Sequence, residues 1–152
     1  MLLLYSGCTL FESKSNIVLY SGVVIANASS SPDKSGITFN EDASFSYVNP
    51  FTEKADIVVS SFLQNSIVFI SPSKDTTLFF TDNETGYQDV GAYMYDYSPE
   101  SGYYDMEFLT SGHYYFIRTS SGRYVRLFLN SFSSDSILCD IEVTSDNSSV
   151  FN

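Results

Sequence analysis

Apolar and polar residues alternate with a period of two along most of this chain, and almost no segment has the 3.6-residue period of an amphipathic helix. β-Branched and aromatic residues fill the alternating runs, and clusters of Ser, Gly, Asn, Asp and Pro separate them. Strands are predicted at residues 17–25, 36–40, 43–48, 56–63, 66–71, 76–81, 91–97, 103–109, 113–119, 123–130 and 136–144. This spacing predicts an all-β fold, a single β-sandwich-like or barrel-like domain of mostly antiparallel strands.

Two hairpins are the clearest supersecondary units in the pattern. In the first, residues 114–119 and 123–129 flank a three-residue turn whose last position, Gly122, can take a positive φ. In the second, residues 91–97 and 103–109 flank a turn at residues 98–102 that contains Pro99 and Gly102. Both segments are therefore expected to form antiparallel strand pairs.

The final predicted strand places one of the two cysteines in the core. Alternation over residues 136–144 puts Ile137, Cys139 and Ile141 on one face, so Cys139 is interpreted as a small core hydrophobe. If the protein is exported to an oxidising compartment, a disulfide between Cys8 and Cys139 is possible. The eight residues after this strand are expected to form a frayed tail.

Composition narrows the class of partner. The chain has 152 residues, 18 acidic against 7 basic side chains, and a net charge of −11, so its surface repels phosphate backbones and nucleic acid is excluded as a partner. Aromatic residues make up 16% of the chain, which supplies core material and argues against disorder. No apolar run reaches the roughly 18 residues of a membrane-spanning helix.

Tyrosines are the candidate ligand-binding residues. Tyr93, Tyr95 and Tyr97 alternate along one predicted strand, and Tyr103 opens the next. Alternate strand residues lie about 7 Å apart, close to the spacing of stacked sugar rings, and phenol edges add hydrogen bonds. The stripe therefore predicts a platform for a glycan or another ring-bearing ligand. The alternative is that the same side chains face the core.

Catalytic and metal-binding signals are weak. Asp105 and Glu107 share a strand face, and His113 is the only histidine, so these three are the candidates for a hydrolase alternative. No Gly-x-Ser-x-Gly motif is present, and the acidic loop at residues 82–89 does not match EF-hand spacing for Ca²⁺. We expect a non-enzymatic protein with no metal or cofactor.

All three arginines of the chain cluster on the first predicted hairpin. Alternation puts Arg126 on the face of Tyr124 and Phe128. We therefore expect at least one of Arg118, Arg123 and Arg126 to stack on an aromatic ring or to pair with an acid across the sheet.

The N-terminal sequence resembles a targeting signal. A short apolar run ends in Tyr5-Ser6-Gly7-Cys8, which resembles the lipobox of bacterial lipoproteins. That resemblance implies acylation of Cys8, which excludes a disulfide through this sulfur, and stable anchoring by the acyl chains. It also implies export to the bacterial cell envelope, at the outer membrane or cell surface. Residues 1–8 are then a partial signal, 9–15 a tether, and 16–152 a single β-rich domain.

The predicted C-terminal hairpins carry a second resemblance. Residues 115–127, followed by a closing strand at 137–143, resemble the HmuY-like β-rich surface lipoproteins. This resemblance implies their fold and location but not their haem function, which uses two histidines where this chain has His113 alone. The expected function is an exported envelope lipoprotein that acts as a binding or interaction module for a glycan or protein partner.

Overall fold

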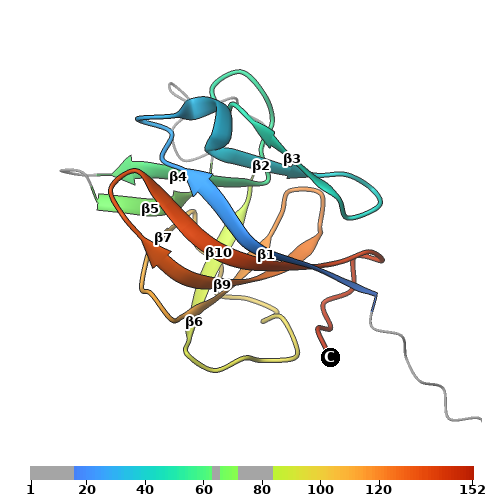
Figure 1. Ribbon diagram of the computed structural model, residues 1–152. Helices are drawn as coiled ribbons and strands as arrows, with labels where there is room; N and C mark the ends of the chain where they lie inside the picture. Colours follow the sequence, from blue (N-terminus) through green and yellow to red (C-terminus); the bar gives the residue numbers. More distant parts are fainter. Residues whose placement is uncertain (1–15, 63–65, 72–83) are drawn as a thin grey trace, which may run out of the picture.

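Two five-stranded antiparallel sheets pack face to face (Figure 1). The computed structural model describes residues 16–62, 66–71 and 84–152. The first sheet has the order β1 (Ile17–Ala26), β10 (Ser136–Thr144), β9 (Tyr124–Phe132), β8 (Tyr114–Arg118) and β6 (Gly86–Gly91). The second has the order β3 (Phe45–Val48), β2 (Gly36–Phe39), β4 (Ile57–Phe62), β5 (Ser66–Ile70) and β7 (Met106–Phe108). The predicted all-β sandwich is confirmed, as two separate sheets.

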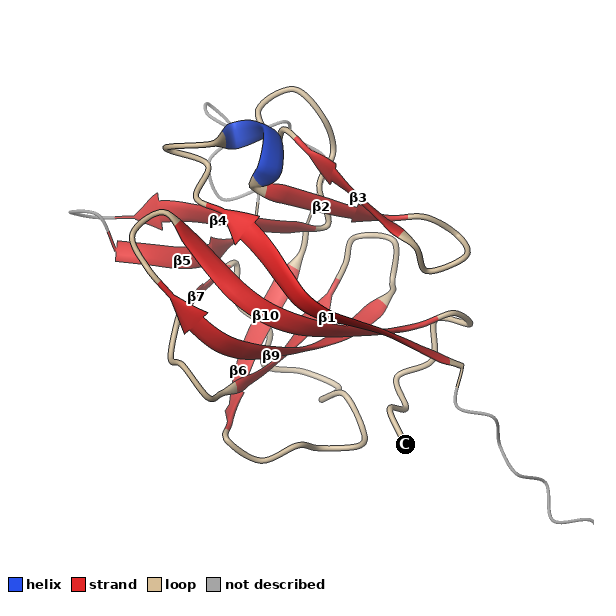
Figure 2. Ribbon diagram, viewed as in Figure 1, coloured by secondary structure: helices blue, strands red, loops and turns tan. Residues whose placement is uncertain are grey.

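Helical structure is minimal. Within the described ranges, the one helical segment is the short 3-10 turn η1 (Pro32–Lys34), which lies above β2 in Figure 2. No helix among these residues is long and apolar enough to cross a membrane.

The core lies between the sheets and follows the period-two pattern of the strands. In β10, Ile137, Cys139 and Ile141 are all buried, as the alternation predicts. Each fully buried aliphatic side chain contributes about 1.5–3 kcal/mol relative to exposure. Burial also raises the pKa of the Cys139 thiol to about 12, so the sulfur is a neutral core group. The prediction for Cys139 is confirmed.

One buried tyrosine ties the two sheets together. The Tyr87 ring, on β6 of the first sheet, stacks on the ring of Phe69 from β5 of the second at a centroid distance of 5.2 Å. Its hydroxyl accepts a hydrogen bond from the Val58 amide at 3.1 Å and donates one to the Ile70 carbonyl at 3.1 Å. Burial raises the pKa of this phenol. The hydroxyl therefore stays protonated and bridges the layers.

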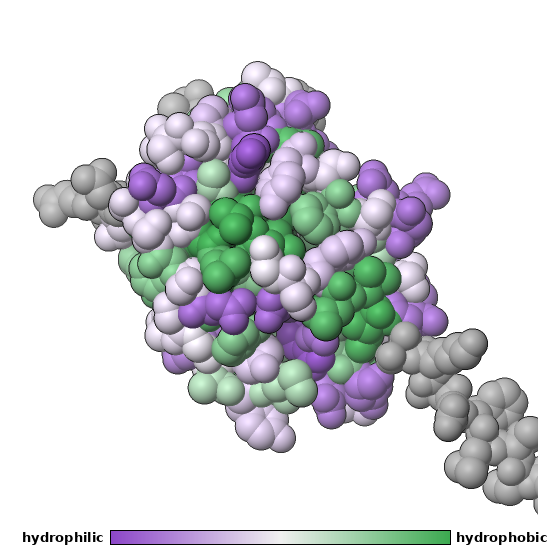
Figure 3. All heavy atoms as spheres, in the orientation of Figure 1, coloured by the Kyte–Doolittle hydropathy of each residue, from purple (hydrophilic) through white to green (hydrophobic). Residues whose placement is uncertain are grey.

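Strand β1 is one edge of the first sheet and is interrupted by a β-bulge. The register with β10 shifts between Tyr20 and Val23, where Gly22 adopts a φ of 69° and donates its amide to the Asp140 carboxylate at 2.8 Å. Val24 and the Leu138 opposite it on β10 are both exposed. Figure 3 shows such apolar groups on this face as separate patches with polar side chains between them.

The hairpin of β8 and β9 is confirmed. Its register runs from Tyr114 opposite Phe128 to Arg118 opposite Tyr124. Gly122 has a φ of 84°, the left-handed conformation that the turn requires.

The second predicted hairpin is wrong. Strand β6 ends at Gly91 and pairs with β8, whereas β7 pairs with β5 of the other sheet, and residues 92–96 belong to no strand. Gly91 has a φ of 79° and donates its amide to the Asp89 carboxylate at 2.8 Å, which turns the chain out of the sheet. The strand predicted at 76–81 lies outside the described residues.

Candidate functional site

The three alternating tyrosines lie on an exposed loop. Tyr93 is 68% exposed, Tyr95 48% and Tyr97 63%, so the alternative that they face the core is wrong. The platform geometry expected of a strand is also absent, because the rings of Tyr93 and Tyr95 meet edge to face at 4.7 Å. We call residues 92–100 the tyrosine loop. Its three tyrosine side chains are exposed to solvent, and they project from a loop and not from a strand.

Buried Arg126 holds the tyrosine loop against the outer face of the first sheet. The guanidinium is 3% exposed and donates Nη1 to the Tyr95 carbonyl at 2.7 Å, while Nε donates to the Glu142 carboxylate. It also lies over the ring of Phe151, 5.2 Å from the centroid. The expectation that an arginine stacks on a ring or pairs with an acid is confirmed.

The C-terminal segment fixes the other side of the loop. The Phe151 amide donates to the Asp96 carbonyl at 2.6 Å, and the Ser98 amide donates to the Ser149 carbonyl at 2.9 Å. Phe151 is 2% exposed and packs edge to face on Phe116 of β8. The prediction of a frayed tail is wrong, because a buried aromatic and backbone hydrogen bonds hold this segment in place.

A cleft of about 730 Å³ lies between the tyrosine loop and the end of β6. It is lined by residues of β6, the tyrosine loop and the C-terminal segment, namely Gln88, Asp89, Val90, Tyr95, Tyr97, Ser98, Pro99, Glu100 and Ser149. We call it the tyrosine cleft. Among the described residues that line it there is no cationic side chain, and their polar groups are hydroxyls, an amide and carboxylates.

Gln88 lines the tyrosine cleft with a side-chain amide that is not fully hydrogen-bonded. Its Oε1 is buried and has no partner among the described residues. A buried acceptor without a donor costs about 1–3 kcal/mol. A ligand hydroxyl would remove that cost only if the Gln88 side chain turned this buried oxygen toward the cleft. The sequence carries no local signal for this residue, which lies in a short polar strand bounded by Gly86 and Gly91.

Tyr103, the fourth predicted tyrosine, contacts Pro99 of the tyrosine cleft but is not among the residues that line the cleft. Its hydroxyl donates to the carbonyl of Pro99 at 2.9 Å, and the Arg118 guanidinium lies 5.3 Å above its ring. Burial raises the pKa of this phenol to about 12. Gly86 is required beneath it, because a Cβ there would lie 2.6 Å from the Tyr103 Cβ.

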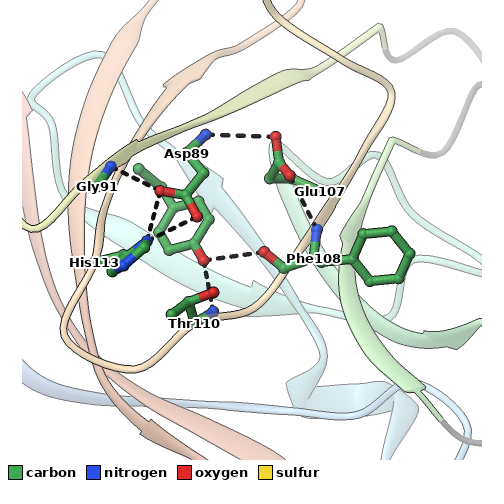
Figure 4. Close-up of polar contacts among 7 residues, drawn as sticks. Asp89, Gly91, Glu107, Phe108, Thr110 and His113 are labelled. Carbon is green, nitrogen blue, oxygen red and sulfur yellow. Dashed lines mark hydrogen bonds and ion pairs between the residues drawn. The ribbon is translucent and has the colours of Figure 1, made fainter.

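The hydrolase candidates separate in the structure. His113 and Glu107 meet Asp89 at one end of the sandwich (Figure 4), whereas Asp105 is an exposed residue beside them in sequence only. The His113 Nδ1 lies 2.9 Å from both carboxylate oxygens of Asp89. Glu107 accepts the Asp89 amide at 3.4 Å and the Phe108 amide at 3.2 Å.

The carboxylates of Asp89 and Glu107 accept hydrogen bonds from nearby backbone amides. Desolvation, with the nearby Asp89 charge as a smaller cause, raises the pKa of Glu107, and its two backbone hydrogen bonds oppose that rise. Tyr115 extends the network by donating its hydroxyl to the Phe108 carbonyl at 3.0 Å and accepting the Thr110 amide at 2.8 Å. Each carboxylate thus orients a main-chain segment, and only Asp89 also lines the tyrosine cleft.

Two further sequence predictions concern metal binding and the N-terminal cysteine. In the described part of the chain, no group of three or more His, Cys, Asp or Glu side chains is placed to hold a metal ion. Cys8 and the tether at 9–15 lie outside the described residues, as do residues 82–83 of the acidic loop.

A solved structure shares this fold. The chain superimposes on the crystal structure of a DUF4466 family protein from Parabacteroides merdae with a TM-score of 0.63 and 12% sequence identity. The match covers 85% of this chain and 54% of that one, so the chain spans about half the length of the solved protein. No protein-family model matches the chain. No curated protein matches it in sequence.

Proposed function

We propose that this protein is a carbohydrate-binding module of the bacterial cell envelope and that a neutral sugar ring lies in the tyrosine cleft. The carrying observation is that two exposed tyrosine rings, Tyr95 and Tyr97, line one cleft together with Gln88, whose buried side-chain oxygen has no partner among the described residues. A sugar ring presents apolar C–H faces and hydroxyl donors together. Phenol rings suit the faces, and the Gln88 amide and the Glu100 carboxylate suit the hydroxyls.

Support also comes from preorganisation of the loop. Arg126 holds the Tyr95 carbonyl, and the C-terminal segment holds Asp96 and Ser98 by backbone hydrogen bonds. A ligand therefore meets tyrosines whose backbone is already ordered, which lowers the entropy cost of binding. The proposal assigns no catalysis to Glu107 or His113, because their polar atoms hold the β6–β8 end of the sandwich together.

Substitution of Tyr97 tests the proposal. We expect Tyr97→Ala to weaken binding of a soluble oligosaccharide by at least about tenfold, because the variant removes one aromatic wall of the cleft. Isothermal titration calorimetry against neutral glucose, mannose and N-acetylglucosamine oligomers measures the effect. Tyr104→Ala is the matched control, because Tyr104 is 62% exposed against 63% for Tyr97 and lies outside the cleft.

A second variant separates binding from folding. Gln88→Leu removes the unpartnered oxygen, so it should leave stability unchanged or raised and still weaken oligosaccharide binding. The proposal fails if no neutral oligomer binds the wild type at millimolar concentration. It also fails if Tyr97→Ala and Tyr104→Ala reduce binding equally.

We further propose that the module is exported and held at the outer membrane or cell surface by a lipid on Cys8. The support is the lipobox-like sequence Tyr5-Ser6-Gly7-Cys8. Intact-mass analysis of protein from membranes of a bacterial host should give the mass of an acylated Cys8 form, and Cys8→Ser should remove both the added mass and the membrane association. An unmodified wild-type protein would contradict this anchoring.

A further inference from the structure

The three arginines of the chain have different environments. Arg123 and Arg126 are buried, and their guanidinium groups donate to backbone carbonyls, with Arg126 also bound to Glu142. Arg118 is exposed. Among the described residues, its guanidinium makes no hydrogen bond and has no carboxylate oxygen within 4.0 Å. In a chain of net charge −11, Arg118 is therefore a cation without an ion pair to the residues that the structure describes.

Arg118 is nevertheless held in position. Its guanidinium lies 5.3 Å above the Tyr103 ring, and its strand neighbour across the sheet is Tyr124. A guanidinium that stacks on a ring loses little further freedom when it binds a planar anion. The stacked geometry therefore favours recognition of a carboxylate through two parallel hydrogen bonds.

Arg118 lines a second cleft, of about 650 Å³. It is lined by the β8–β9 turn and the segment that precedes β6, namely Glu84, Arg118, Thr119, Ser120, Gly122 and Tyr124. We call it the arginine cleft. It combines one cation, one carboxylate, two hydroxyl side chains and an aromatic ring. Glu84 disfavours a dianion here but can accept hydrogen bonds from sugar hydroxyls.

We propose that the arginine cleft is a second binding site and takes the carboxylate of an acidic sugar, with Arg118 on the carboxylate and Glu84 on ring hydroxyls. This inference rests on the proposed function, because the carboxylate that Arg118 binds is carried by a sugar ring. The ligand class is then an acidic glycan, with a neutral ring in the tyrosine cleft and a carboxylated ring in the arginine cleft.

Tyr103 links residues that line the two clefts. Tyr103 contacts both walls, through Pro99 on the tyrosine cleft and Arg118 on the arginine cleft. Along β6, Gly86 lies opposite Arg118, and Gln88 lies two residues further on the same face. That separation is about 7 Å along the strand.

An NMR titration of the wild-type protein tests the arginine cleft by itself. D-Glucuronate should shift the Arg118 Nε–Hε resonance in a saturable way, while D-glucose at the same concentration should leave it unshifted. Arg118→Gln should weaken D-glucuronate binding by at least about tenfold, because it removes a charge-assisted pair. Arg118→Lys should recover part of the affinity, because it restores the charge but not the paired donors.

Two controls make the outcome decisive. Lys34→Gln removes an exposed cation elsewhere and should leave D-glucuronate binding unchanged. Inorganic sulfate should bind more weakly than D-glucuronate because of Glu84. Equal shifts with sulfate and D-glucuronate, or no shift at Arg118, would overturn the inference. Failure of the neutral-oligomer experiment with an intact Arg118 response would instead overturn only the function proposed for the tyrosine cleft.

Discussion

Single side chains decide how buried polar groups are accommodated in this sandwich. Asp56 is 7% exposed, and its Oδ2 accepts the Phe39 amide at 2.8 Å and the Thr38 hydroxyl at 3.3 Å. Desolvation raises the pKa of this carboxyl, although both hydrogen bonds act to lower it. The charged form is therefore tolerated in the folded state but disfavoured relative to water.

A pH-dependent contribution to stability follows from Asp56. The folded state holds the proton more tightly than the unfolded state, so this residue's contribution becomes less favourable as pH rises from about 4 through the raised pKa. Asp56→Asn should therefore gain stability relative to wild type over that rise and then level off. Urea unfolding over a pH series measures the difference. Exposed Asp105→Asn controls for the loss of one charge, and parallel curves for both variants would contradict the assignment.

Elements are positioned by contacts between segments that lie far apart in sequence. The β8–β9 hairpin could be predicted because its turn and its alternation are local, with Gly122 at the position that needs a positive φ. The tyrosine loop could not. Its alternation is typical of a strand, but the Arg126 guanidinium donates a hydrogen bond to the Tyr95 carbonyl and the Phe151 amide donates one to the Asp96 carbonyl. These partners come from β9 and the C-terminal segment, so no local pattern reveals them.

Removal of Arg126 should release the tyrosine loop. We expect Arg126→Met to lower the free energy of unfolding by on the order of 3 kcal/mol, because Glu142 and the Tyr95 carbonyl lose their buried partner. Oligosaccharide binding should fall as well, since the loop loses its anchor. Chemical denaturation and calorimetry measure the two effects.

The exposed arginine supplies the matched control for this variant. Arg118→Met should change stability by less than about 0.5 kcal/mol, because its guanidinium makes no hydrogen bond to the described residues. Equal losses of stability in both variants would contradict the anchoring role of Arg126.

At the scale of the whole molecule, the number and spacing of strands predicted a sandwich, but not the strand order. The order β1-β10-β9-β8-β6 brings the first and last strands side by side, and no local pattern reveals a pairing between segments so far apart in sequence. The candidate site was likewise predictable only in part from the sequence. Tyr95 and Tyr97 were predicted and line the cleft, whereas Gln88 and Ser149 join it only through the tertiary fold.

The bulge in β1 has a consequence for colloidal behaviour. An uninterrupted strand at the edge of a sheet offers a row of backbone donors and acceptors onto which another polypeptide can add. Here Gly22 bends that row and gives its amide to Asp140, within a strand that carries exposed Leu19 and Val24. The kink in β1 and the repulsion between molecules that each carry a net charge of −11 both disfavour amyloid-like self-association.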